Sequence, residues 1–334
     1  MMKVVLGFSG GVDSAVSAAL LQRAGYEVHC LYLDNTDERA RQDAIDTAAF
    51  LGLPLTIADV HAELEEKVAL PFCESYCRGE TPNPCILCNP SLKFAHLLAE
   101  ADRLGAEKIA TGHYARAEGG ALFKGQPSND QSYMLCRLRR EQVERLTLPL
   151  GQFEKVQVRA MAEELRLPVA HKADSMEICF IPDQDYVGFL ARRRALPPEG
   201  DFLFHGKVVG RHEGIVRYTV GQRRSGLYEG RKLYISRIDA QKNTIELALW
   251  EELFQSDLRA RDFNWLCDPP SAPMRASVRV RHTKWENPDC TAAVESDGFV
   301  RIVCDEPVRA PAAGQSAVLY DGERVLGGGF ICSG

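Results

Sequence analysis

The sequence predicts an α/β protein: an N-terminal doubly wound parallel-sheet domain, a small β-rich central domain and a C-terminal β-barrel. Up to about Pro197, short apolar runs alternate with longer stretches of helical period, which is typical of a parallel sheet covered by helices on both faces. Beyond that residue, short strands separated by Gly, Asp and Pro turns follow, which indicates small β domains. We expect three domains, over residues 1–197, 198–256 and 257–334.

The first domain opens with a buried strand over Lys3–Phe8 and a helix over Asp13–Arg23. Gly25 should close this helix, because glycine readily adopts the left-handed conformation found after helix ends. The elements expected next are a strand at Glu27–Leu33, a helix at Asp37–Leu51, a strand at Leu55–Ala58, a helix at Ser91–Leu104 and a strand at Lys108–Thr111. Ligands of such sheets bind at the carboxyl ends of the strands.

The rest of the chain predicts two groups of short strands. In the central domain they are Lys207–Gly210, Leu233–Asp239 and Thr244–Ala248. In the last domain they are Ala276–His282, Cys290–Glu295, Val300–Val303 and Ala317–Tyr320. The second group suggests a small barrel.

Composition and charge are those of an ordinary globular protein. Of 334 residues, 45% are hydrophobic and 26% charged, no stretch reaches the roughly 20 apolar residues of a membrane span, and the N-terminus does not resemble a secretory signal. We therefore expect a cytoplasmic protein that does not associate with membranes. The formal net charge is -6, yet eight Lys or Arg and only two acids lie within Lys207–Arg237. This stretch, and the basic residues from Arg275 to Lys284, could attract a polyanion or could form an ordinary solvated surface.

The turn after the first strand carries the clearest chemical signal. Small residues between a strand and a helix, here Ser9–Ser14, present bare backbone N–H groups to a phosphate. A carboxylate in such a loop would repel the phosphate unless a cation intervened, so Asp13 predicts Mg²⁺. The loop has neither the lysine nor the spacing of the Walker A motif, and it is not the dinucleotide fingerprint.

The loop Ser-Gly-Gly-Val-Asp-Ser resembles the signature of the PP-loop ATP pyrophosphatases, which cleave ATP between its α- and β-phosphates and adenylate a carbonyl. Further motifs narrow the resemblance to the tRNA 2-thiouridylase family and extend it over nearly the whole chain. They are Thr81–Asn89, Ala110–Tyr114, Asp130–Tyr133, Asp174–Ile181, Tyr218–Arg223 and Pro311–Gly329.

The resemblance implies ATP-dependent exchange of oxygen for sulfur at carbon 2 of the wobble uridine, in tRNAs for Lys, Glu and Gln. By motif position Cys179 resembles the family's persulfide carrier, and Cys88 the partner that completes transfer through a transient Cys88–Cys179 disulfide. Thiol exchange needs an exposed thiolate, so we expect both cysteines on mobile loops. Without the resemblance, the apolar neighbours of Cys179 would favour burial. The implied partners are tRNA and a sulfur donor, either a cysteine desulfurase or a relay protein, and the chain is expected to be a monomer.

Other positions carry over in the same way. Asp13 counts among the catalytic residues, and the positions that match ATP contacts are Gly7, Phe8, Ser9, Gly10, Gly11, Val12, Asp13, Ser14, Leu33 and Gly112. Those that match contacts to tRNA or to its target base are Asn83, Pro84, Cys85, Asn129, Asp130, Gln131, Arg281 and His282. A lysine common in the family stands where this chain has Asn129, which puts one phosphate contact in doubt. His113 taken alone is typical of a structural histidine.

Cys85 departs from the family pattern, because many members carry Asp there. Cys85-x-x-Cys88 has metal-ligand spacing. These two cysteines and Cys179 could hold an iron–sulfur cluster, for example [4Fe-4S], whose open iron would bind the sulfur to be delivered. Alternatively no metal is present and Cys85 is a spare or resolving thiol. A third possibility is a zinc site formed by Cys73, Cys77, Cys85 and Cys88. The spacing of Cys73 and Cys77 is, however, equally consistent with one face of a helix.

The other cysteines are expected to be buried as small apolar side chains. They are Cys30, Cys136, Cys267, Cys290, Cys304 and Cys332. Two rival functions stay open at this point. One is a PP-loop ligase or amidotransferase that adenylates a small carboxylate and needs no cysteine pair. The other is an RNA-binding module with a decayed nucleotide site.

Overall fold

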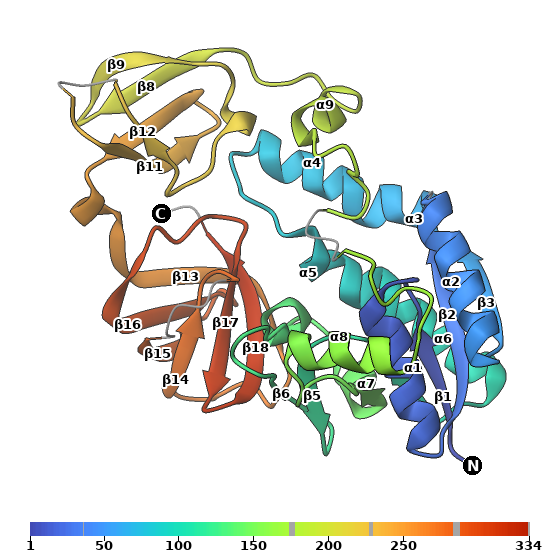
Figure 1. Cartoon of the computed structure of the whole chain (residues 1–334). Coiled ribbons are helices and arrows are strands. Elements are labelled where there is room, and N and C mark those ends of the chain that lie inside the picture. The colour runs from blue at the N-terminus through green and yellow to red at the C-terminus, as the bar shows by residue number, and fades with distance from the viewer. Residues whose placement is uncertain (36, 174–177, 227–229, 283–287, 333–334) are drawn as a thin grey trace. The chain divides into compact units, whose positions relative to one another are not determined.

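The computed structural model of the chain describes residues 1–35, 37–173, 178–226, 230–282 and 288–332 (Figure 1). The motif residues Asp174–Glu177 and the basic residue Lys284 lie outside the described residues. Within the described ranges, no helix is both long and apolar enough to cross a membrane.

A five-stranded parallel sheet forms the N-terminal part of the fold, as predicted. Its strands are β1 (Lys3–Gly7), β2 (Glu27–Asp34), β3 (Leu55–Asp59), β4 (Lys108–Ala110) and β7 (Leu146–Thr147). Their order is β3-β2-β1-β4-β7, and every pair is parallel. The chain steps outward from β1 to β3 and then returns to the other side of β1 at β4. The carboxyl ends of β1 and β4 therefore lie at a topological switch point, where α/β sheets bind ligands.

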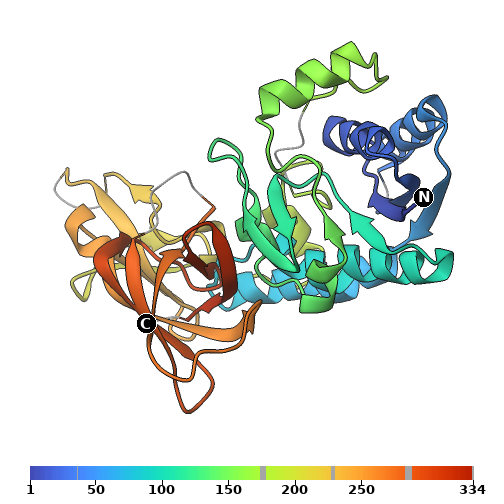
Figure 2. The same cartoon turned by 90° about the horizontal axis from the view of Figure 1, so that it is seen from below.

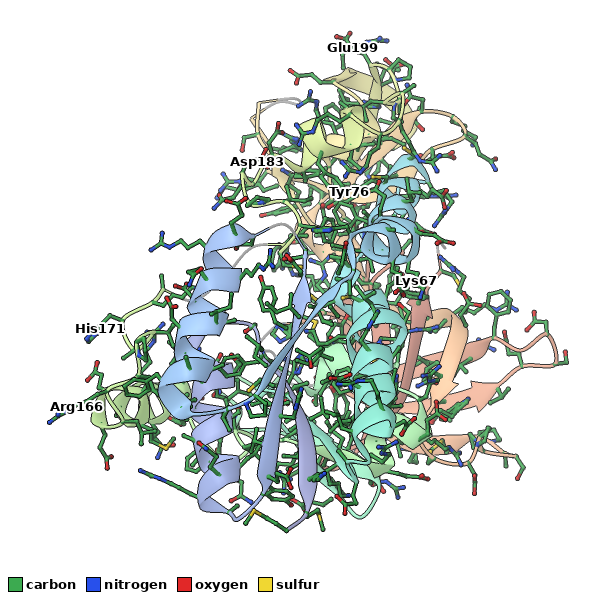
Figure 3. The ribbon with its side chains drawn as sticks, turned by 90° about the vertical axis from the view of Figure 1, so that its right-hand side faces the viewer. Lys67, Tyr76, Arg166, His171, Asp183 and Glu199 are labelled. Carbon is green, nitrogen blue, oxygen red and sulfur yellow. The ribbon has the colours of Figure 1, made fainter. Side chains whose placement is uncertain are left out.

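Helices cover both faces of this sheet (Figure 3). The main ones are α1 (Val12–Arg23), α2 (Glu38–Leu51), α6 (Phe94–Leu104) and α8 (Lys155–Glu164). Helix α1 contacts α2 and α8, whereas α6 packs against β1 and β4. The doubly wound arrangement is confirmed, and Gly25, with a φ of 84°, closes α1 as expected.

The helix expected over Ser91–Leu104 has a different beginning. Helix α5 (Pro84–Cys88) runs into a π-helix, η2 (Asn89–Lys93), before α6 starts. Pro90 has no N–H and cannot make the usual α-helical hydrogen bond, and the chain passes this position as a wider turn. The remaining helices and strands before residue 184 are α3 (His61–Leu64), η1 (Glu65–Ala69), α4 (Leu70–Cys77), β5 (Ala115–Glu118), β6 (Ala121–Lys124), η3 (Ser132–Leu135) and α7 (Arg140–Glu144).

The central part contains a second five-stranded sheet, of order β10-β11-β12-β8-β9. Its strands are β8 (Gly200–Phe204), β9 (Lys207–His212), β10 (Arg223–Arg224), β11 (Leu233–Asp239) and β12 (Thr244–Ala248). Short 3₁₀ turns, η4 (Ile215–Arg217) and η5 (Trp250–Leu253), flank it. Its core also includes Phe72 of α4 and Phe189 of helix α9 (Tyr186–Ala191). A segment inserted within the nucleotide domain and a segment that follows it thus share one core with this sheet.

The C-terminal part is the expected antiparallel barrel (Figure 2). Its six strands are β13 (Phe254–Trp265), β14 (Met274–Arg279), β15 (Asp289–Val294), β16 (Val300–Arg309), β17 (Ser316–Asp321) and β18 (Arg324–Ile331). They belong to an eight-stranded sheet that β6 and β5 extend beyond β18. Pairing of β13 with β18 closes the barrel. The glycines of β18 weaken its strand signal in sequence, and the structure explains them. A Cβ at Gly327 would lie 2.1 Å from the carbonyl oxygen of Asn264, so glycine permits the closing contact.

The chain divides into two compact units that differ from the expected domains. The first comprises Met1–Lys67, Cys85–Met176 and Glu323–Val325, and the second comprises Val68–Pro84, Glu177–Gly322 and Leu326–Gly334. Residues 177–197, expected in the first domain, belong to the second unit. The apolar faces of α4 and α9 are the physical reason, because both are buried against the central sheet. The expected boundary at residue 256 falls within β13.

Candidate active site

The loop Ser9–Ser14 connects the carboxyl end of β1 to the N-terminus of α1, as the sequence predicted. No side chain caps this helix: Gly11 is its N-cap and makes no side-chain hydrogen bond. The Ser14 hydroxyl instead donates to the Gly11 carbonyl oxygen at 3.0 Å and lies 3.3 Å from the Ser9 hydroxyl. The first N–H groups of a helix point away from its body and lack partners within it, so this loop has the form of an anion-binding turn.

Gly10 brings the loop against helix α2. Its φ is 70°, and an added Cβ would lie 2.4 Å from the Ala40 carbonyl oxygen. Lys172 fixes the same contact, since its Nζ donates to the Gly10 carbonyl oxygen at 3.0 Å and pairs with Asp43 of α2 at 2.5 Å. These contacts restrain the loop, which favours ligand binding because less ordering is then required.

The carboxylate of Asp13 is engaged by two side chains distant in sequence. Lys155 is the first residue of α8, and its Nζ lies 2.7 Å from both carboxylate oxygens of Asp13. The Tyr114 hydroxyl donates to Asp13 Oδ1, also at 2.7 Å. A cation was expected beside Asp13, and in this structure Lys155 supplies one.

Leu33 and Gly112 end the two strands that flank β1. Leu33 is the penultimate residue of β2 and is half-buried. Gly112 follows β4, and a Cβ there would lie 3.0 Å from the backbone carbonyl carbon of Asp13. Together with Gly7 at the end of β1, the positions predicted to contact ATP lie along one edge of the sheet, which is where the topology places a ligand.

His113 is a structural residue of the same edge. It is paired with the Thr111 hydroxyl through Nδ1 at 2.7 Å, and its ring lies beside Phe94. Burial, with a smaller effect of Lys93, holds the pKa of His113 well below its usual range. The imidazole is therefore neutral at physiological pH and is not a phosphate-binding cation.

Cys85 and Cys88 lie in helix α5 rather than on a loop, so that expectation was wrong for Cys88. Cys85 is exposed and Cys88 is half-buried. Burial raises the pKa of the Cys88 thiol, and Lys93 opposes this only in part. The segment that follows is fixed by Asn89, whose amide donates to the Met134 carbonyl oxygen at 2.8 Å. Cys88 is thus a protonated thiol in a fixed helix.

Cys179 lies in a turn of the second unit and is exposed. The Ile181 N–H donates to the Ile178 carbonyl oxygen at 2.8 Å across this turn. Ile178, Phe180 and Ile181 pack into or against the core of the central sheet. The apolar neighbours of Cys179 are therefore buried while its own side chain faces solvent. The alternative that Cys179 is itself buried was wrong.

Comparison with known proteins identifies the family. The protein-family model described as a tRNA methyl transferase HUP domain matches residues 2–183, the corresponding PRC-barrel model residues 188–248, and an aminomethyltransferase beta-barrel model residues 255–331. A protein named tRNA-specific 2-thiouridylase MnmA from Syntrophotalea carbinolica is 43% identical over 345 residues, with 98% of each chain covered. One of that name from Syntrophomonas wolfei is 41% identical, with 99% of this chain and 100% of the relative covered.

The chain belongs to the tRNA-specific 2-thiouridylase family. The resemblance of its motifs to this family is thus accompanied by sequence similarity to the relatives over nearly the full length of the chain. The relatives have essentially the same length as this 2-thiouridylase-family chain.

The first-unit residues Asn129, Asp130 and Gln131, which are predicted to contact tRNA, make hydrogen bonds within this unit. The carboxylate of Asp130 is buried and accepts hydrogen bonds from the N–H groups of Gly125 and Ser132, at 2.8 and 3.0 Å. Gln131 Oε1 accepts from the Tyr114 N–H at 3.0 Å. Because Tyr114 binds Asp13, Gln131 supports the nucleotide loop. Asn129 is half-buried and donates to the Phe153 carbonyl oxygen at 3.5 Å.

The predicted tRNA contacts of the second unit differ in exposure. Arg281 Nη2 donates to the carbonyl oxygens of Val220 and Ala310, at 2.8 and 2.5 Å, and so joins the central segment to the barrel. His282 is exposed. Asn83 is half-buried and Pro84 is buried at the start of α5. Contact of these residues with tRNA stays a prediction.

Within the described ranges, no group of three or more His, Cys, Asp or Glu side chains is placed to hold a metal ion. Cys73 and Cys77 lie on helix α4, the first buried and the second half-buried. Of the cysteines expected to be buried, Cys267 and Cys332 are only half-buried, whereas the other four are buried.

Three residues of this site were not singled out by the sequence. Tyr114 lay inside a motif but had no assigned role, and Lys155 and Lys172 lay outside every motif quoted for the resemblance. They reach the loop across 101, 142 and 162 residues of sequence respectively. No local signal marks such residues, because their role depends on where α8 and the segment after it pack.

Proposed function

We propose that the chain catalyses ATP-dependent 2-thiolation of the wobble uridine of tRNAs for Lys, Glu and Gln. The observation that carries this proposal is the preformed loop Ser9–Ser14 at the end of β1, in a chain that belongs over its full length to the 2-thiouridylase family. A phosphate-binding loop accounts for the use of ATP, and the names of the relatives specify tRNA and carbon 2.

ATP is needed because the uracil carbonyl is a poor electrophile whose oxygen is a very poor leaving group. We propose that the C2 oxygen attacks the α-phosphorus, that the bond between the α-phosphorus and the bridging oxygen breaks, and that pyrophosphate leaves. The N–H groups of the loop and the Lys155 ammonium would stabilise the negative charge that develops on the pyrophosphate. Lys155 would do so while it remains close to Asp13.

Sulfur would arrive as a persulfide on Cys179. Its terminal sulfur attacks C2, and AMP leaves with the former carbonyl oxygen. Cys88, whose thiol must first lose its proton, then attacks the Cys179 sulfur; the S–S bond to the delivered sulfur breaks, and its electron pair remains on the thiouridine. This leaves a Cys88–Cys179 disulfide, which an external thiol reductant must reduce. The exposure of Cys179 supports its role as acceptor from a donor protein.

Two metal cofactors remain proposals, Mg²⁺ and an iron–sulfur cluster. Both oxygens of Asp13 are already paired with Lys155, so Mg²⁺ bound through Asp13 would have to displace that lysine. Helix α5 supplies two thiols for an iron–sulfur cluster, and Cys179 of the second unit would be the third ligand. An iron and sulfide assay on anaerobically purified protein tests the cluster, and stoichiometric iron would establish it.

The remaining proposals concern partners and location. We propose a cytoplasmic monomer that takes sulfur from a cysteine desulfurase or from a relay protein. Size-exclusion chromatography with light scattering tests the monomer. Transfer of labelled sulfur to Cys179 from each purified donor class would identify the donor.

Complementation tests the proposed function directly. In a strain that lacks its own tRNA 2-thiouridylase, the wild-type chain should restore 2-thiouridine in tRNA, measured by mass spectrometry of nucleosides. The Cys179→Ala variant should not, whereas Cys267→Ala should. Full restoration by Cys179→Ala would overturn the sulfur-transfer assignment. Pyrophosphate release that required a small carboxylate and ignored tRNA would favour the rival ligase.

A further inference from the structure

Within the second unit, a loop of the C-terminal barrel holds the backbone of Thr81 from both sides. The Thr81 N–H donates to the Ala313 carbonyl oxygen at 2.7 Å. Gln315 Nε2 donates to the Thr81 carbonyl oxygen, also at 2.7 Å, across 234 residues of sequence. The Thr81 hydroxyl is buried and has no hydrogen-bond partner among the described residues. The barrel therefore binds this residue through its peptide groups.

The loop that holds Thr81 is itself hydrogen-bonded to the last strand of the barrel. The Gly314 N–H donates to the Ile331 carbonyl oxygen at 3.0 Å, and the Ile331 N–H donates to the Gln315 carbonyl oxygen at 2.8 Å. Gly314 has a φ of 85°, and an added Cβ would lie 2.8 Å from the Glu80 Cβ. Glycine is thus required at this position both by the backbone conformation and by the close approach of the held segment.

A second attachment joins the barrel to the preceding residue. The Glu80 carboxylate, 13% exposed, accepts from Arg261 of β13 and from Arg78, each at 2.9 Å. Burial by itself would raise the pKa of Glu80, but the two guanidinium groups outweigh it, and the pKa lies below its usual range. Glu80 therefore remains charged and stays paired with the barrel.

We propose that Gln315, Gly314 and Arg261 are positioning residues for sulfur transfer. The held residue Thr81 lies four positions before Cys85 and seven before Cys88, and helix α5 begins at Pro84. Only three residues of the chain separate the held residue from Cys85. Positional error of about 1 Å at reacting groups can cost on the order of a hundredfold in rate. This inference rests on the proposed function, and it assigns the barrel a role in the chemical step.

The first test separates positioning from nucleotide binding. Gln315→Met keeps the length of the side chain and removes the donor to Thr81. We expect kcat for 2-thiouridine formation to fall five- to tenfold, as for the loss of one hydrogen bond, with KM for ATP unchanged. Gln315→Asn, which keeps the amide on a shorter stem, should recover part of kcat. Gln255→Met, at an exposed position of β13, is the matched control and should behave as wild type.

The second test needs no substrate. Hydrogen exchange measured by mass spectrometry should show faster exchange of a peptide spanning residues 78–88 in Gln315→Met than in Gln255→Met, with equal melting temperatures. If Gln315→Met does not fold, Arg261→Met provides the same comparison at the second attachment.

The outcomes are distinguishable. Faster exchange with reduced kcat supports the proposal. Unchanged exchange overturns it, and so does faster exchange with unchanged kcat, because the segment would then be held without consequence for the chemistry. If the wild-type chain forms no 2-thiouridine while the exchange result holds, the proposed function fails and the structural contact stands.

Discussion

Replacement of Lys155 tests the electrostatics of the nucleotide loop. In the wild-type chain the Lys155 ammonium lies 2.7 Å from both oxygens of Asp13. Lys155→Met removes this charge and keeps most of the aliphatic side chain. Asp13 would then present an uncompensated negative charge beside the phosphates of ATP, and one phosphate-binding cation would be lost. We expect weaker binding of ATP.

The exposure of the pair sets the magnitude. The side chains of Lys155 and Asp13 are 28% and 32% exposed, which lies between an exposed pair, worth about 0–1 kcal/mol, and a buried one, whose breakage costs about 3–5 kcal/mol. A loss of about 1.4 kcal/mol corresponds to a tenfold change in an equilibrium constant. KM for ATP should therefore rise about tenfold.

The assay is tRNA-dependent pyrophosphate release as a function of ATP concentration. Lys108→Met is the matched control, because Lys108 begins β4 at the opposite end of the sheet and donates to the Glu144 carbonyl oxygen. A double-mutant cycle with Asp13→Asn isolates the pair, and the coupling should be about 1 kcal/mol. Effects that add to within about 0.3 kcal/mol, or an unchanged KM in Lys155→Met, would refute the reasoning.

Three further predictions follow from backbone conformation and from pKa shifts. Gly10→Ala places a Cβ 2.4 Å from the Ala40 carbonyl oxygen. It should lower the free energy of unfolding, measured in urea, by more than about 2 kcal/mol and abolish pyrophosphate release. Gly52→Ala is the control: its φ is 64° but its surroundings are open, so the free energy of unfolding should fall by only about 1 kcal/mol. Burial lowers the pKa of His113 far below its ordinary 6.5, so mild acid protonates this residue only in the unfolded chain. The free energy of unfolding should therefore fall below pH 6.5 by up to about 1.4 kcal/mol per pH unit. His113→Asn should reduce this slope, and an unaltered slope would contradict a buried, neutral His113. Iodoacetamide should modify Cys88 more slowly than the exposed Cys85 at neutral pH, because burial raises the pKa of Cys88 above its ordinary 9.0, and mass spectrometry that found equal rates would exclude a buried, protonated Cys88.

Much of the fold could be predicted because its signals are local. The periodicity of apolar residues and the positions of turn residues correctly predicted β1, α1, β11 and β12. The π-helix at Asn89–Lys93 was missed, because a regular helical period over Ser91–Leu104 conceals a local change of winding. Strand β18 was missed because its glycines have a tertiary purpose, the approach of β13.

The division into units was not predictable from local pattern. The segment Val68–Pro84 lies within the first expected domain in sequence but belongs to the second unit. Its apolar residues read as an ordinary helix face, and only packing shows that Phe72 and Cys73 share a core with the central sheet. The same applies to Cys179, whose apolar neighbours favoured burial although its own side chain faces solvent.

The sequence alone determined the position of the nucleotide loop, because a strand, a glycine-rich turn and a helix follow one another within Lys3–Arg23. Motifs spread over nearly the whole chain indicated its family. Tertiary structure alone decided what surrounds that loop: Lys155 and Tyr114 reach Asp13, and Lys172 reaches Gly10, across more than one hundred residues. Local pattern encodes how a segment folds on itself. Which charges meet depends on how separate segments pack, and the contacts that hold Asp13 and Thr81 arise only there.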